Sequence, residues 1–200
     1  MTEKSILGEP LWKIGVMDEQ LEKRLRFLRE ANTQALPHSE RGLFDHLLGT
    51  RQLLVEWGAR PAVCDAGLFH SVYSTEYFAP AAVPLTLRND VRQLIGEEAE
   101  SLVWLFCMMR RKTLLNGNRE RQRDFTVQNR LTGEQIPLSD AQFNDLVTIT
   151  IANSLEPFSR LSWKGRRDCG RHLRRYRSIA IPAVQAAIDR VAIRWWEIWK

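Results

Sequence analysis

The chain has 200 residues, of which 44% are hydrophobic and 26% are charged, and its formal net charge is +5. This balance excludes an intrinsically disordered chain and predicts a single domain over residues 1–200. The first residues lack the apolar stretch of a secretory signal, and no apolar run approaches the roughly 20 residues of a membrane span. We therefore expect a cytoplasmic protein without membrane contact, whose cysteines stay reduced: Cys64, Cys107 and Cys169.

Helical periodicity runs through the first half of the chain. Residues 17–31 predict an amphipathic helix, and residues 43–57 predict a second one with two adjacent apolar stripes. Gly58 suits the C-terminal cap of that helix, and Pro61 suits the first turn of a third helix over residues 62–73. Small residues on one face of the third helix predict a close approach to a neighbouring helix.

The second half of the chain mixes helical segments with one hairpin. Alternating residues on either side of a glycine-containing turn predict a two-stranded β-hairpin near residues 124–138. The predicted helices cover residues 87–95, 97–110, 139–155 and 182–199. The fold class is therefore predicted to be all-α, a helical bundle with one small hairpin.

Two basic segments carry much of the excess charge. Residues 160–177 contain eight Lys or Arg and one acidic residue, and residues 110–123 contain six and one. Such segments attract phosphorylated ligands, although a solvated helix face is the more ordinary interpretation. Because no zinc-finger spacing and no RRM or KH signature accompanies them, we expect a small-molecule partner, phosphorylated or not, and no nucleic acid.

Three short motifs lie in or beside the predicted helices. They are HSERGLFDH at residues 38–46, LFHSVY at residues 68–73 and IANSLE at residues 151–156. In their order they resemble the HD superfamily of helical metal-dependent phosphohydrolases, especially the hydrolases of the alarmone (p)ppGpp. The chain is identified as a degenerate member with His-Ser in place of His-Asp. The resemblance covers residues 38–156 and implies an HD-type bundle, with the basic segment and a Trp-rich helix following at residues 157–200.

The resemblance also implies a metal site. In the family a His, a His-Asp pair and a later Asp hold a divalent cation, and here these positions fall on His46, His70-Ser71 and Asn153. Two carboxylates are therefore missing. Because Mg²⁺ prefers carboxylate oxygens whereas imidazole suits softer ions, the expected cofactor is a divalent transition metal (Fe, Mn or Zn), without tight Mg²⁺ binding.

One carboxylate is expected to complete the metal ligands. Glu156 is the first candidate because it lies three residues after Asn153 and thus on the same helical face, and Glu76 is the second. The acidic pair that assists (p)ppGpp hydrolysis in the family falls on Ser74 and Thr75. Glu76, one position late, is therefore the predicted catalytic carboxylate, and we predict no useful alarmone hydrolysis.

Three functional hypotheses remain open from the sequence. The first is a metal-assisted enzyme that hydrolyses a phosphoester or, as in some HD-like di-iron proteins, uses oxygen. The second is a metal-free pocket in which the histidines act as acid and base or contact a ligand. The third is a non-catalytic binding or assembly domain. The predicted catalytic residues are His46, His70 and Glu76; the metal ligands His46, His70, Asn153 and Glu156; and the ligand contacts His38, Ser39, Ser71 and Asn153.

Two further expectations concern the C-terminal part of the chain. His172 lies among arginines and is predicted to be solvated. The last predicted helix carries Trp195, Trp196 and Trp199, whose spacing favours amphipathic packing or the seam of a homodimer.

Overall fold

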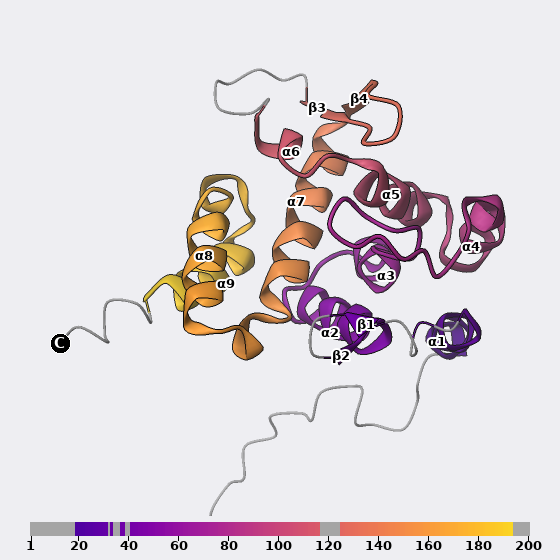
Figure 1. Cartoon of the computed structure of the whole chain (residues 1–200), viewed down its shortest axis with the longest axis horizontal. Helices are drawn as coiled ribbons and strands as arrows, with labels where there is room; N and C mark the ends of the chain where they lie inside the picture. The colour runs from indigo at the N-terminus through magenta and orange to yellow at the C-terminus, as the bar shows by residue number, and fades with distance from the viewer. Residues whose placement is uncertain (1–18, 32, 34–36, 39–40, 117–124, 194–200) are drawn as a thin grey trace, which may run out of the picture.

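The structure is a computed structural model that describes residues 19–31, 33, 37–38, 41–116 and 125–193. Within these residues the fold is mostly helical, with two small two-stranded sheets (Figure 1). The α-helices are α1 (Glu19–Glu30), α2 (Leu43–Glu56), α3 (Pro61–Phe69), α4 (Arg88–Ile95), α5 (Glu97–Met108), α6 (Thr113–Asn116), α7 (Asp140–Leu155), α8 (Trp163–Arg174) and α9 (Pro182–Ile193). Short 3-10 turns are η1 (Leu85–Leu87), η2 (Phe158–Arg160) and η3 (Arg177–Ile179).

Helices α2, α3, α5 and α7 form the centre of the bundle. α2 packs against α3 and α7, and α3 also packs against α5 and α7. α7 separates the other three helices of the centre from the α8–α9 pair, and α8 packs against it (Figure 1). Large apolar side chains fill the space between the helices, including Leu47, Leu54, Phe69, Phe106 and Ile151, all fully buried. Segments about a hundred residues apart in the chain thus meet at one place.

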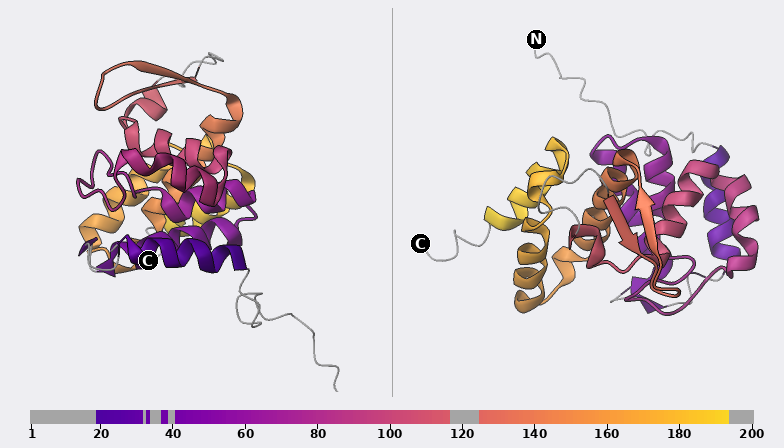
Figure 2. Two further views of the ribbon diagram at one scale, coloured as in Figure 1. Left: turned by 90° about the vertical axis from the view of Figure 1, so that its right-hand side faces the viewer. Right: turned by 90° about the horizontal axis from the view of Figure 1, so that it is seen from above.

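The predicted hairpin is present. β3 (Phe125–Gln128) pairs antiparallel with β4 (Gln135–Leu138), and Phe125 is opposite Leu138. The hairpin lies at one end of the bundle, beside the start of α7 (Figures 1 and 2). A second, two-residue pair, β1 (Pro37–His38) with β2 (Arg41–Gly42), precedes α2 and was not predicted. The fold class, all-α with a small hairpin, is confirmed.

Local signals place most helix ends where the sequence predicts them. Gly58 adopts a φ of 69° after α2, a conformation that costs glycine little, and Pro61 opens α3. Gly96, with a φ of 87°, separates α4 from α5. Ser139 caps α7 in a reciprocal box with Gln142, which satisfies two backbone N–H groups at the helix start.

Apart from the short helix α6, which was not predicted, two helices differ from the predictions. The third helix ends at Phe69 and not near residue 73, because His70 takes the cap position and the following turn brings Val72 O into a hydrogen bond with Val83 N. α8 occupies the basic segment where no helix was predicted. It starts at Ser162, whose side chain accepts a hydrogen bond from Gly165 N. Its apolar residues are few, and it contains two glycines, which are poor helix formers.

The remaining predictions on the fold concern the membrane and the chain end. No helix in the described part of the chain is long and apolar enough to cross a membrane. The last helix, α9, is described as far as Ile193. The three tryptophans of the predicted dimer seam, Trp195, Trp196 and Trp199, lie outside the described residues.

Candidate functional site

Two buried histidines meet at the centre of the bundle. His46 lies in α2 and His70 directly follows α3, and their exposed fractions are 1% and 0%. Their rings are in edge contact, with centroids 5.1 Å apart. Gly67 permits this approach, because a Cβ built on it would lie only 2.2 Å from Leu54 Cδ1 of α2. The small residues of α3 thus bring the two helices together.

Asn153 of α7 completes a triangle of polar atoms. Its Oδ1 lies 3.0 Å from His46 Nε2 and 2.9 Å from His70 Nε2, and the two nitrogens are 3.2 Å apart. We call these three atoms the central triangle. The three residues that the sequence analysis grouped come together here from three helical elements.

The hydrogen bonds of the two Nδ1 atoms determine whether the Nε2 atoms in the triangle carry a hydrogen. His46 Nδ1 lies 2.7 Å from Glu156 Oε2, and His70 Nδ1 lies 2.7 Å from the carbonyl oxygen of Gly67. Both partners only accept, so each Nδ1 carries a proton and donates it. When the imidazoles are neutral, both Nε2 atoms are therefore acceptors. The triangle then holds three lone-pair donors about 3 Å apart with no hydrogen between them.

Burial keeps the second histidine neutral. It holds the pKa of His70 well below its ordinary value; the electrostatic interactions with His46 and Arg111 act in the same direction, whereas the hydrogen bonds to Gly67 and Asn153 act against it. Phe106 adds to the apolar surroundings, with its ring edge-on to His70 at a centroid distance of 5.1 Å.

Glu156 lies behind His46. Its carboxylate accepts from His46 Nδ1 and from Arg160, which is 2.7 Å from both oxygens. Burial by itself would raise the pKa of Glu156, but the hydrogen bonds from His46 and Arg160 outweigh it and lower the pKa below its ordinary value. Gly49 leaves room for this side chain, because a Cβ there would be 2.8 Å from Glu156 Cγ.

Glu156 therefore orients the imidazole and does not complete the triangle, unlike the ligand role predicted for it. It contacts the opposite side of the His46 ring from Nε2. Among the described residues no group of three or more His, Cys, Asp and Glu side chains surrounds one point, because the third group of the triangle is an amide. Such an outer carboxylate fixes the tautomer of a histidine and raises its basicity as a ligand.

Glu76 and Ser71 do not belong to the triangle. Glu76 accepts a hydrogen bond of 2.7 Å from the backbone N of Arg111, which holds its carboxylate against the segment between α5 and α6. Ser71 is buried and lines the neighbouring pocket. His38 belongs to β1, and its side chain is not described; Ser39 lies outside the described residues.

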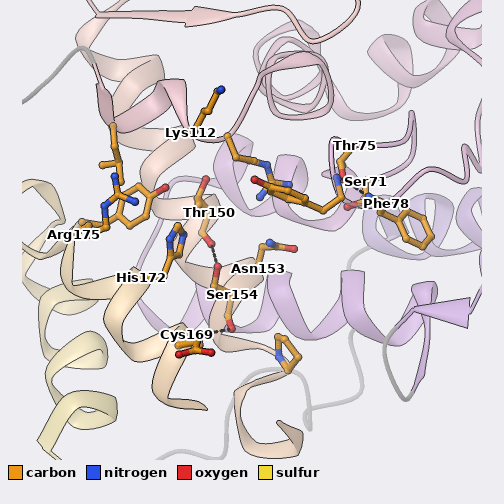
Figure 3. A pocket seen from close by; sticks show the side chains of 16 residues that line it. Ser71, Thr75, Phe78, Lys112, Thr150, Asn153, Ser154, Cys169, His172 and Arg175 are labelled. Atoms are coloured by element: carbon orange, nitrogen blue, oxygen red, sulfur yellow. Dashed lines mark hydrogen bonds between the residues drawn. The ribbon is translucent and has the colours of Figure 1, made fainter. Parts of the chain in front are cut away.

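A pocket with a volume of about 550 Å³ lies beside the triangle (Figure 3). Asn153 belongs to both, so the pocket reaches the central triangle. The size falls within the range of roughly 300–1,000 Å³ usual for small-molecule sites. The lining includes cationic side chains, aromatic rings and hydroxyls: Arg111, Lys112, Arg175, Tyr77, Phe78, Tyr176, Ser71, Thr75, Thr150 and Ser154. His172 is exposed, as predicted, and also lines the pocket.

Residues 27–111 match the model of a family described as a domain of unknown function (DUF6817). No curated protein and no solved structure matches the chain. The matched segment contains both histidines of the triangle, whereas Asn153, Glu156 and α8 lie beyond it.

Several site residues were missed in the sequence. Arg160 lies four residues after Glu156, a spacing that predicts an ion pair along one helical face, and this signal was available. Gly49 has no local signal, because its role depends on the side chain that α7 places against it. The pocket residues that α8 contributes were not predicted because α8 itself was not predicted.

Proposed function

We propose that this protein is an HD-type, transition-metal-dependent enzyme that hydrolyses a phosphoester of a small molecule bound in the pocket. The central triangle is the observation that supports it. Three lone-pair donors pressed together in a buried place repel one another, and a positive centre among them relieves this cost. The basic lining of the pocket favours hydrolysis of a phosphorylated molecule over the oxygen chemistry of some HD-like di-iron proteins.

The spacing of the triangle fits a metal ion. Two ligands about 2.1 Å from one ion are about 3.0 Å apart at right angles and about 3.4 Å apart in a tetrahedron. The three edges here measure 3.2, 3.0 and 2.9 Å. Two imidazole nitrogens and an amide oxygen suit Zn, Fe or Mn, and they suit Mg²⁺ poorly because no carboxylate is among them.

The chain's own groups would hold such an ion and its substrate. His46 and His70 present Nε2 because Glu156 and the Gly67 carbonyl hold their Nδ1 protons. A divalent transition metal supplies Lewis acidity and lowers the pKa of water. Asn153 connects the triangle to the pocket, so a substrate bound there has its reacting phosphoester beside the ligands.

A metal-free site is the second candidate, and the same triangle favours it. A single proton on His46 Nε2 would make an imidazolium that donates to His70 and Asn153 while Glu156 balances its charge. Rotating the amide of Asn153 by a half-turn would also place its NH₂ group between the two nitrogens. In either case the histidines serve a ligand or a proton transfer directly.

Metal binding separates the two candidates. Protein purified without a metal-affinity tag is stripped with EDTA and titrated calorimetrically with Zn²⁺, Mn²⁺ and Mg²⁺. We expect about one Zn²⁺ or Mn²⁺ per chain and no micromolar Mg²⁺ affinity. Asn153→Asp should bind Mn²⁺ more tightly, because it adds a negative charge to the triangle, and His70→Ala should lose the site.

Activity is measured as phosphate release from a panel of phosphorylated small molecules with the metal that binds. Turnover that disappears in His70→Ala supports the proposal. Absence of stoichiometric metal in the wild type and in Asn153→Asp contradicts it and favours the metal-free pocket. Metal binding without turnover of any phosphoester would favour a binding or assembly role.

A further inference from the structure

Arg111 carries a half-buried positive charge. It follows α5, and its guanidinium lies 3.8 Å from the centroid of the Phe106 ring, which is itself in edge contact with His70. Its Nε is buried and has no hydrogen-bond partner among the described residues. Burial lowers the pKa of Arg111 to about 10, so the side chain stays charged at neutral pH. Glu76 accepts a hydrogen bond from the backbone N of Arg111, and its charge also acts on the side chain in the direction that raises the pKa, against the larger effect of burial.

A guanidinium removed this far from water usually has a carboxylate partner, and Arg111 forms no side-chain ion pair within the described part of the chain. The ring of Phe106 compensates the charge in part, through a cation–π contact worth about 0.5–2 kcal/mol in general. No carboxylate neutralises the charge, and the Arg111 side chain lines the wall of the pocket. This arrangement calls for an anion that comes from outside the chain.

Two more cations line the same pocket. Lys112 comes from the segment after α5, and Arg175 comes from the C-terminal end of α8 (Figure 3). The charges of Arg111 and Arg175 both act on a third residue of the pocket, His172. After burial, which is the largest cause, both lower the pKa of His172, a neighbour on the same wall.

One acidic residue, Asp168, lines the pocket. It lies within 3.7 Å of Arg167 and 3.6 Å of Arg171, two exposed arginines of α8 that are not part of the lining. Three cations therefore face one carboxylate that already has basic neighbours. The lining has an excess of positive charge, in a hollow about large enough for one small molecule.

We infer that Arg111, Lys112 and Arg175 form an anion subsite that binds a phosphate group of the ligand, with α8 as its second wall. The inference deepens the proposed function, because it places a phosphate next to the triangle and gives the substrate class as phosphorylated small molecules. A phosphate fits better than a single carboxylate because its charge approaches −2 and three cations surround it. The guanidinium fork of Arg111 matches its geometry.

Inorganic pyrophosphate is the probe. Calorimetric titration of the full chain in EDTA measures the subsite without any metal, and sodium acetate at equal ionic strength tests for a carboxylate. We expect saturable pyrophosphate binding, weakened about tenfold or more in Arg175→Gln and in Arg111→Met. Arg174→Gln is the matched control. It removes the same charge one position earlier, from an exposed residue that does not line the pocket.

The variants separate a built subsite from a diffuse basic surface. Arg175 is exposed, so Arg175→Gln tests the subsite even if Arg111→Met unfolds on circular dichroism. No saturable pyrophosphate binding at millimolar concentration, equal weakening in Arg174→Gln, or equal affinity for acetate would each overturn the inference. Since EDTA is present, failure here leaves the metal proposal standing. Pyrophosphate binding by a chain that takes no metal would remove the metal proposal alone.

Discussion

Gly67→Ala should destabilise the protein by crowding the contact between α2 and α3. The new Cβ would lie 2.2 Å from Leu54 Cδ1, whereas carbon atoms in contact are about 3.5–4.0 Å apart. Leu54 is fully buried and cannot swing into solvent. Overpacking of this kind costs about 1–3 kcal/mol, and the better helix propensity of alanine returns about 1 kcal/mol. Because the clash at 2.2 Å is severe, the cost should reach the upper part of that range, about 2–3 kcal/mol, and we expect a net loss of about 1–2 kcal/mol.

Urea unfolding followed by circular dichroism measures this loss. Leu54→Val removes a methylene where the new methyl collides, so Gly67→Ala combined with Leu54→Val should lose less stability than the sum of the two single changes. Gly165→Ala in α8 is the control, because its nearest foreign atom, Leu161 Cβ, is 3.2 Å away on a partly exposed helix. A Gly67→Ala protein within about 0.5 kcal/mol of wild type, or strictly additive changes, would refute the role of this glycine in bringing the helices together.

Three other measurements test the site. Metal-free protein should lose stability as the pH falls below about 6.5, by up to about 1.4 kcal/mol per pH unit. The reason is that His70 takes up a proton in the unfolded chain, whereas in the folded chain burial lowers its pKa and keeps the proton off. If urea unfolding of His70→Gln shows the same dependence of stability on pH as the wild type, this prediction is wrong. Glu156→Gln should weaken Zn²⁺ or Mn²⁺ binding about 10–100-fold, whereas Glu76→Gln should not; calorimetry that finds the two equal rejects the orienting role of Glu156. Finally, with Mn²⁺ and ppGpp we expect pyrophosphate release well below about 1 per second, and faster release that vanishes in His70→Ala would show that the missing aspartates matter less than argued.

The outline of the fold was predictable because its signals are local. Apolar periodicity, Gly58, Pro61, Gly96 and the Ser139 cap each act within a few residues, and the hairpin at residues 124–138 shows alternation around a glycine turn. α8 was missed because its apolar residues are few and because Gly165 and Gly170 are poor helix formers.

The sequence by itself determined which residues form the centre of the site. His46, His70 and Asn153 occur at positions whose helix order resembles a known metal-site pattern, and the chemistry of their side chains limits the metals that suit them. The absence of two aspartates is also a property of the sequence alone.

Only the tertiary structure decided how these residues face one another. Helical spacing placed Glu156 on the face of Asn153, yet whether its carboxylate meets Nε2 or Nδ1 of His46 depends on how α7 packs against α2. The meeting of Arg111 with Arg175 across one pocket likewise joins segments more than sixty positions apart. Such contacts arise from packing between helices, and no local pattern in the sequence encodes them.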